Sequence, residues 1–342
     1  MNRGYKDFVL FLSILWTITV ALDIFYMILL YRPYFGDLLH VPFPVFIIIP
    51  LPVLLFYLPG YFTAMWFGFL IIVFSVFFLI AISTGIIKFE NSALFRISEF
   101  YALNLFLSVV YFLFVDAIGK PVKVPISNNT PFYLNMLSLT NAGLYEELIT
   151  RVLYIGIPLY IYYKMKKPDW RENGKEVKWY RMLWGGGYKL GKPEITVLII
   201  SSLIFGIAHT SSWDWSKMPQ AFMGGLFLGF LYLRYGLYAD VLWHFSIDAT
   251  SAFLPEGLGN PYANGISNGI AIFVDLIFIL AGAVILIYYI VSLVKRGKKG
   301  ENTAPKTVNT AVCPRCGSLD VSLIYDDIYR CNRCGNIFKR IR

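Results

Sequence analysis

The sequence predicts an all-α polytopic membrane protein with about eight transmembrane helices and a small cysteine-bearing module at its C-terminus. Of the 342 residues, 57% are hydrophobic and 15% are charged. Soluble domains contain about 45–50% apolar and about 25% charged residues. The apolar residues form runs of the length that crosses a bilayer, which is about 20 residues for a helix. All four cysteines follow residue 312, outside these runs.

The apolar runs predict eight helices, at residues 7–32, 61–88, 97–119, 134–163, 194–211, 218–235, 239–254 and 268–294. Residues 42–59 are also apolar, but they include five prolines. Proline removes a backbone donor and interrupts a helix. We therefore predict a broken or re-entrant segment that does not cross the membrane. It belongs to an N-terminal region, residues 1–133.

Two basic segments predict the orientation of the chain in the cell membrane. Residues 164–192 hold nine Lys or Arg against three acids, and residues 295–342 hold eleven against four. Excess Lys and Arg beside membrane spans marks the cytoplasmic face. With eight spans, both termini are cytoplasmic. The net charge of +9 is therefore read as a topology signal, and no nucleic-acid partner is expected.

The cysteines predict a zinc ribbon over residues 312–342, after a basic and polar linker at 295–311. They form two Cys-x2-Cys pairs with 14 residues between them: Cys313, Cys316, Cys331 and Cys334. This spacing suits a tetrahedral structural zinc site. Two disulfides are the alternative, which a reducing cytoplasm disfavours. The ribbon could also recruit a protein partner.

Charged residues inside the predicted spans indicate a functional site, because each is costly to place in a membrane. Glu147 and Arg151 stand four residues apart, with the acid first, which favours a helical ion pair. Glu146 lies about 100° round the helix and stays unpaired. Asp23 and Asp275 are interpreted as structural polar contacts, and Asp240 as a residue near a helix end within reach of water.

Two further spans bring histidines to membrane depth. His209 lies in one, and His244 lies in another, four residues before Asp248 and on the same helical face. Glutamate and histidine together suit the activation of water, and further polar groups can stabilise an oxyanion. The pattern predicts amide hydrolysis within the membrane. The chain has no H-E-x-x-H, G-x-S-G or G-x-G-D motif of other intramembrane hydrolases.

Three segments resemble the motifs of the CPBP intramembrane proteases, the family of the CAAX-processing prenyl endopeptidases and the Abi proteins. "EELITR" is similar to the E-E-x-x-x-R motif, "FGIAH" to F-x-x-x-H and "HFSID" to H-x-x-x-N/D. The resemblance covers about residues 134–254, within a protease core at 134–294. It implies that Glu146 activates a water with help from His209, and that His244 and Asp248 stabilise the tetrahedral intermediate. Glu147, Arg151 and Phe205 would support them.

Asp248 departs from family members that have asparagine here. An ionised aspartate cannot donate a hydrogen bond to an oxyanion, so it must be protonated, polarise His244 or bind a metal. By residue type, Glu146, His209, His244 and Asp248 could form a zinc site. A catalytic metal is therefore left open.

The resemblance implies that the substrate is a protein or peptide in the lipid bilayer, cut near a prenylated C-terminus. Two other classes of function fit the same residues. A transporter or channel could use buried Glu and His to relay protons or bind an ion, although no inverted repeat is visible. A non-catalytic membrane scaffold could recruit partners through its zinc ribbon.

Overall fold

The computed structural model describes residues 3–120, 131–166, 171–172, 175–176, 179–253, 261–302, 312–325 and 328–339. Contacts divide the chain into two compact units, Met1–Ile285 and Leu286–Arg342.

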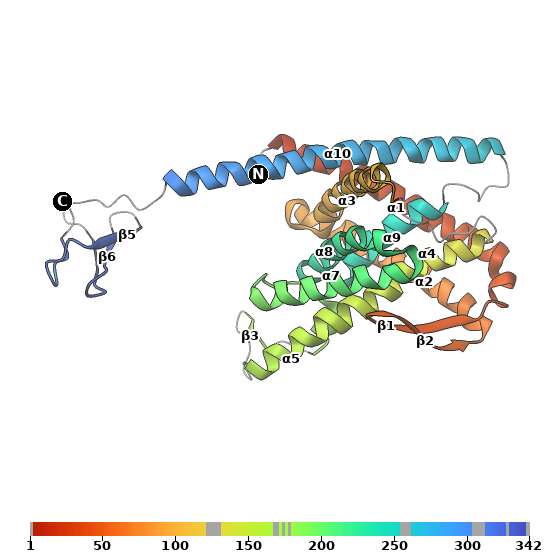
Figure 1. Ribbon diagram of the computed structural model, residues 1–342, viewed down its shortest axis with the longest axis horizontal. Helices are drawn as coiled ribbons and strands as arrows, with labels where there is room; N and C mark the ends of the chain where they lie inside the picture. The colour runs from red at the N-terminus through yellow and green to blue at the C-terminus, as the bar shows by residue number, and fades with distance from the viewer. Residues whose placement is uncertain are drawn as a thin grey trace. The chain divides into compact units, whose positions relative to one another are not determined.

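The first unit is built from helices in all eight predicted positions (Figure 1). The long helices are α1 Arg3–Leu38, α2 Gly60–Lys88, α3 Ala93–Ala117, α4 Phe132–Glu147, α5 Ile157–Lys166, α7 Lys192–Trp213, α8 Met218–Arg234, α9 Leu237–Phe253 and α10 Pro261–Asn302, of which α10 continues into the second unit. Short helical turns are η1 Phe89–Asn91, α6 Arg181–Trp184 and η3 Trp215–Lys217. Two antiparallel strands of two residues each follow α5: β3 Arg171–Glu172 and β4 Lys175–Glu176.

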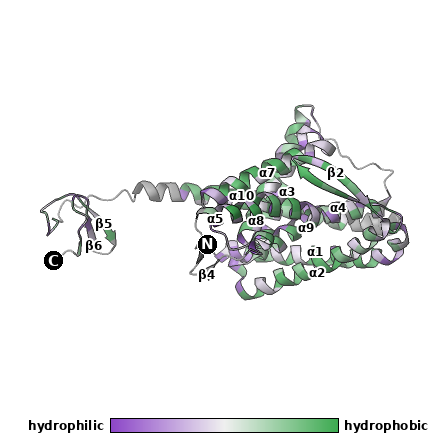
Figure 2. Cartoon of the chain, turned by 90° about the horizontal axis from the view of Figure 1, so that it is seen from below, coloured by the Kyte–Doolittle hydropathy of each residue, from purple (hydrophilic) through white to green (hydrophobic). Residues whose placement is uncertain are grey.

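The outer faces of these helices are apolar, as a bilayer requires. Figure 2 shows that much of the helical ribbon consists of hydrophobic residues, and many large hydrophobic side chains on these helices are exposed. Among the described residues, five helical segments are long and apolar enough to cross a membrane: Arg3–Leu38, Gly60–Asn91, Ala93–Ala117, Lys192–Ser211 and Gly269–Lys295. The prediction of a helical membrane protein is confirmed. The count of eight spans stays a prediction, because α8 and α9 have only 17 residues each.

Two glycines allow the helices that carry the predicted site to approach closely. A Cβ at Gly143 of α4 would lie 3.1 Å from the backbone of Phe245 on α9. A Cβ at Gly225 of α8 would lie 3.0 Å from the backbone of Ser202 on α7. Small residues at helix contacts are typical of membrane bundles, where packing drives association. The motif-bearing helices are therefore held backbone to backbone.

The predicted continuous helix at 134–163 changes its winding in the middle. After Glu147 the chain forms a π-helix, η2, over Leu148–Gly156, before α5 begins. π-Helical turns are rare in proteins, and those that do form are often found at functional sites. Here the wider turn begins directly after the two motif glutamates.

Residues 42–59 form a β-hairpin, not a broken helix. β1 Phe43–Ile49 pairs antiparallel with β2 Leu51–Leu58, and Phe43 stands opposite Leu58. The two ends of the segment therefore lie together, as a segment that enters and returns requires. The outer edge of β1 is bound to hydroxyls rather than to a third strand. Tyr145 Oη accepts from Phe46 N at 3.2 Å and donates to Phe46 O at 2.8 Å, and Tyr154 Oη donates to Ile48 O.

The second unit contains a three-stranded antiparallel sheet in the order β5 Val321–Tyr325, β6 Ile328–Cys331, β7 Ile337–Lys339. Each Cys-x2-Cys pair is followed by a glycine with positive φ, 68° at Gly317 and 72° at Gly335. Their N–H groups donate to the carbonyls of Cys313 and Cys331. These turns fold each cysteine pair into a knuckle.

Candidate active site

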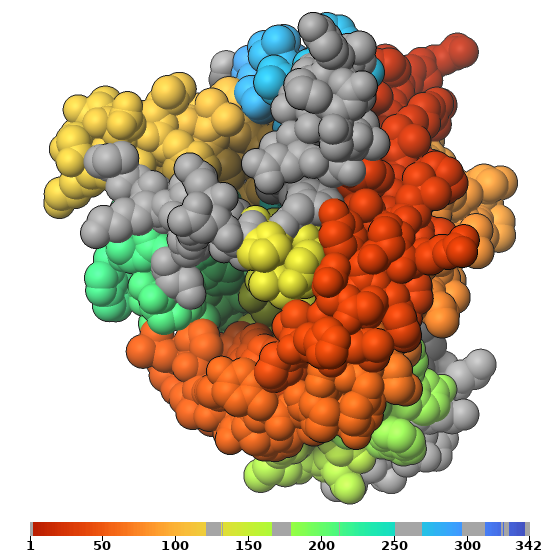
Figure 3. Space-filling model, turned by 90° about the vertical axis from the view of Figure 1, so that its right-hand side faces the viewer, coloured from red at the N-terminus to blue at the C-terminus, as the bar shows by residue number. Residues whose placement is uncertain are grey.

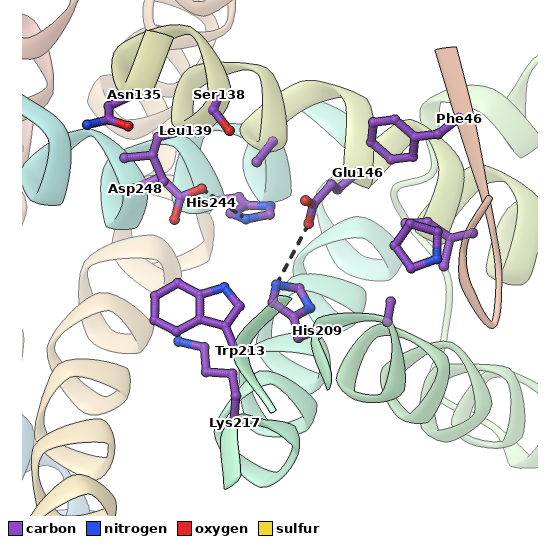
Figure 4. A pocket seen from close by; sticks show the side chains of 14 residues that line it. Phe46, Asn135, Ser138, Leu139, Glu146, His209, Trp213, Lys217, His244 and Asp248 are labelled. Atoms are coloured by element: carbon purple, nitrogen blue, oxygen red, sulfur yellow. Dashed lines mark ion pairs between the residues drawn. The ribbon is translucent and has the colours of Figure 1, made fainter. Parts of the chain in front are cut away.

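A cavity of about 470 Å³ lies between the β-hairpin, α4, α7 and α9 (Figure 4). Its wall contains all four predicted catalytic residues. In the space-filling view the surface of α4, in yellow, is recessed between α1, in red, and the green segment after α7 (Figure 3). The lining residues are Phe46, Ile48, Pro52, Asn135, Ser138, Leu139, Ala142, Glu146, Ala208, His209, Trp213, Lys217, His244 and Asp248.

Glu146 and His209 face each other across this cavity. Glu146 Oε2 lies 4.0 Å from His209 Nε2, and their side chains are 22% and 20% exposed. His209 Nδ1 lies 2.8 Å from the carbonyl of Phe205. A carbonyl only accepts, so Nδ1 carries the hydrogen and Nε2 of the neutral ring is an acceptor. The pair is too far apart for a direct hydrogen bond, and a water about 2.8 Å from each would bind both.

Glu147 points away from the cavity into a buried network. Its Oε2 accepts from Arg151 Nε at 2.7 Å, and its Oε1 lies 2.8 Å from His244 Nδ1. Arg151 also donates to Ser201 Oγ at 3.0 Å and lies over the Phe205 ring at 5.0 Å. The predicted pair of Glu147 and Arg151 is present. Its link to His244, which joins α4 to α9, is a finding that the sequence did not predict.

His244 lies between two carboxylates. Nδ1 faces Glu147, and Nε2 lies 3.3 Å from Asp248 Oδ2. The Phe205 ring meets the His244 ring edge-on at 5.8 Å. Of the three roles open to Asp248, contact with His244 is the one that this geometry displays. Both nitrogens of His244 are thus engaged within the protein.

Asp240 is a correction to the sequence interpretation. It was expected to reach water near a helix end, but it is fully buried. Its carboxyl accepts from the backbone N–H of Val241 at 2.9 Å and lies close enough to Glu147 and Arg151 to interact with them electrostatically. The first turn of α9 therefore faces the buried network instead of the membrane surface.

Several lining residues were missed because they come from segments without a motif. Phe46, Ile48 and Pro52 belong to the hairpin, Trp213 is the last residue of α7, and Lys217 belongs to the turn between α7 and α8. In the sequence, Lys217 reads as an ordinary charge at a helix end. Only its position eight residues after His209 could have pointed to the site.

The two candidate metal sites differ in geometry. The four cysteine sulfurs lie within 4.8 Å of one another, with 3.6 Å between Cys313 and Cys334 and 3.5 Å between Cys316 and Cys331. Tetrahedral zinc with bonds of about 2.3 Å separates sulfurs by about 3.8 Å. These residues therefore fit a bound metal ion. Within the described part of the chain, Glu146, His209, His244 and Asp248 form no such convergent group.

One protein family matches the part of the chain that contains the polar residues of the cavity. Residues 128–250 match the family model described as type II CAAX prenyl endopeptidase, Rce1-like. This part of the chain is therefore similar to the CAAX-type endopeptidases. No curated protein and no solved structure matches the chain. The resemblance predicted from the three motifs is confirmed over this range, which includes every residue from Glu146 to Asp248. The hairpin and the cysteine unit lie outside it.

Proposed function

We propose that this protein is an intramembrane endopeptidase that hydrolyses a peptide bond of a membrane-associated protein, close to a prenylated C-terminus. The family match supports a CAAX-type endopeptidase in general. The observation that supports hydrolysis by an activated water is the pair of Glu146 and His209, 4.0 Å apart on the wall of the cavity. Both groups are acceptors, so a water between them donates a hydrogen to each and turns its lone pair towards the substrate.

The chemical step then follows from these two groups. Glu146 accepts a proton from the water as the oxygen forms a bond to the scissile carbonyl carbon, and the π-electron pair moves onto the carbonyl oxygen. When this pair re-forms the carbonyl, the carbon–nitrogen bond breaks and the leaving nitrogen takes the proton from Glu146. The products are a new carboxyl group and a new amino group. The hydrogen bond from His209 Nδ1 to the Phe205 carbonyl holds the ring in place. Nε2 then remains an acceptor that orients the water.

Glu147 and Arg151 act as positioning residues in this proposal. Their ion pair is completely buried, and the second oxygen of Glu147 fixes the ring of His244. Removing one partner from a buried pair leaves an uncompensated charge. The pair therefore fixes the geometry of α4 against α9 and leaves Glu146 facing the cavity.

The hairpin gives the cavity an apolar wall. Phe46, Ile48 and Pro52 line it opposite the polar residues of α7 and α9. β2 is exposed along nearly its whole length and consists of apolar residues and one tyrosine. A substrate with a prenyl chain would meet this surface from the lipid. The hairpin is thus suited to guide an apolar substrate towards Glu146.

We also propose the orientation that the basic segments predict, with zinc in the cytoplasmic ribbon. Lys6 pairs with Glu90, so the start of α1 and the turn after α2 lie at the same end of the unit. Labelling with an impermeant maleimide tests the orientation in a ribbon-deleted chain, which has no native cysteine. Cysteine placed at Asn173 should stay unlabelled in intact cells, and cysteine at Asp37 should react. Labelling at Asn173 would reverse the orientation.

The experiment that tests the function is a comparison of membrane-protein C-termini in cells with the wild-type protein and with Glu146→Gln. Substrates should accumulate uncut C-termini in the variant, and the cut position should fall beside a prenylated cysteine. A set of termini that is identical in the two cell lines would reject the proposal. Cuts far from prenylated residues would keep the endopeptidase and reject the substrate class.

A further inference from the structure

Lys217 is a cation on the cavity wall that forms no ion pair with a carboxylate in the part of the chain that the structure describes. It ends η3, the turn between α7 and α8, and is half-buried. Its ammonium lies 4.1 Å from the Trp213 ring centroid and 5.6 Å from that of Phe112. No described carboxylate oxygen lies within 4.0 Å of it. Figure 4 shows the Lys217 side chain next to Trp213, on the same cavity as His209 and Asp248.

The expected oxyanion-stabilising residues lack a free donor. Both nitrogens of His244 face carboxylates, those of Glu147 and Asp248. His209 uses Nδ1 on a carbonyl and presents Nε2 to Glu146. An ionised Asp248 can only accept hydrogen bonds. Hydrolysis nevertheless places a negative charge on the carbonyl oxygen, and donors aimed at that charge are usually the largest contribution to catalysis.

Burial and the Asp248 carboxylate act in opposite directions on the charge of Lys217. Burial lowers the pKa of Lys217 to about 8, and the nearby Asp248 carboxylate opposes this shift. At neutral pH the ammonium is therefore still mostly protonated. The titratable groups that line the cavity with it are Glu146 on α4, His209 on α7, and His244 and Asp248 on α9. A lysine ammonium offers three donors, and a charged donor forms a stronger hydrogen bond than a neutral one.

We propose that Lys217 is a catalytic residue that stabilises the oxyanion, in the role that Asp248 cannot fill while ionised. This inference rests on the proposed endopeptidase function. As the water oxygen bonds to the carbonyl carbon, the π-electron pair moves onto the oxygen, and Lys217 donates a hydrogen bond to it. Lys217 keeps its proton throughout. The proton taken from water by Glu146 leaves with the amine.

The proposal makes Lys217 and Asp248 interdependent. Asp248→Asn would introduce an amide N–H that can itself donate to the oxyanion. Lys217→Met should therefore lower kcat by about 10²–10³-fold in the wild-type background, with little change in KM. In the Asp248→Asn background the same substitution should cost much less. Lys192→Met, at the exposed start of α7, is the matched control and should leave kcat unchanged.

The assay uses purified protein and a quenched-fluorescence peptide whose cysteine carries a prenyl thioether, made with a free C-terminal carboxylate and as the carboxamide. An oxyanion role predicts the same loss of kcat in Lys217→Met for both peptides. A rise of KM for the free acid alone would show that Lys217 binds a substrate carboxylate, and would overturn the proposal. Equal losses of kcat with and without Asp248→Asn would also overturn it.

The pH profile adds a readout that a structural role would not change. Lys217 is charged below its pKa of about 8, so kcat/KM should fall as the pH rises through this value. Lys217→Arg keeps its charge and should retain activity with a flattened alkaline limb. Full activity of Lys217→Met, with Glu146→Gln inactive, would reject Lys217 and leave the proposed function standing. No cleavage by the wild-type protein would reject both.

Discussion

Glu146 and Glu147 are neighbours in the chain, but they lie in two different environments. The side chain of Glu146 is 22% exposed and ends 4.0 Å from His209 on a cavity wall. The side chain of Glu147 is completely buried, with Arg151 at 2.7 Å and His244 at 2.8 Å. One residue step turns a helical side chain by about 100°. The Glu146 carboxylate therefore lies in an accessible cavity, whereas the Glu147 carboxylate lies in a buried structural network.

This difference shows which contacts suit chemistry and which suit stability. A general base needs an open acceptor within reach of a water. A buried charge needs partners that satisfy both of its oxygens. Glu146 meets the first condition and Glu147 meets the second. Substitutions at the two positions should therefore affect different measured quantities.

The largest expected loss of stability follows Glu147→Gln. It leaves Arg151 buried without its counter-charge, which should lower the free energy of unfolding by about 3–5 kcal/mol. Thermal unfolding of the purified protein measures this loss. Glu90→Gln, at a half-exposed ion pair with Lys6, is the matched control and should change stability by about 0–1 kcal/mol. Replacing both members of the pair, as in Glu147→Gln with Arg151→Met, should recover part of the loss.

A contrary result would exchange the two roles. If Glu147→Gln keeps the wild-type melting temperature but loses turnover, Glu147 acts in the chemistry and the network interpretation is wrong.

The sequence predicted those parts of the site that depend on spacing along one helix. Glu147 with Arg151, and His244 with Asp248, are both four residues apart, and both pairs are present. The contact of His244 with Glu147 joins residues 97 positions apart. It depends on how closely α4 and α9 pack, which helical spacing cannot reveal. Lys217 was missed because it lies in a turn, which has no periodic sequence signal.

The fold was predicted where long apolar runs leave few alternatives. All eight helices were found, but an apolar run alone does not distinguish a strand from a helix. Residues 42–59 were expected to be broken or re-entrant, and they form a hairpin. Pro52 stands opposite Ile48, whose carbonyl points outward to Tyr154, so the missing N–H of proline costs no bond in the ladder. The π-helix after Glu147 likewise had no sequence signal.

The cysteine unit differs from the cavity in its metal-binding geometry, because its four sulfur atoms lie within 4.8 Å of one another. Deleting residues 300–342 should remove about one zinc per chain, and turnover should stay at the wild-type level. Metal analysis of the wild-type and truncated proteins measures the first effect, and the quenched prenyl peptide measures the second. One tightly bound metal ion in the truncated protein would place a metal on the Glu146 side and contradict the assignment of Glu146 as a free base.

The central claim is that Glu146, and not its neighbour, activates the water. The most direct measurement is the turnover of Glu146→Gln with the prenyl peptide, expressed per folded molecule and compared with Glu147→Gln at a temperature where both are folded. We expect Glu146→Gln to lose about 10²–10⁴-fold in kcat while its melting temperature stays that of the wild type. Wild-type turnover by Glu146→Gln would contradict the account, because the cavity would then hydrolyse its substrate without its base.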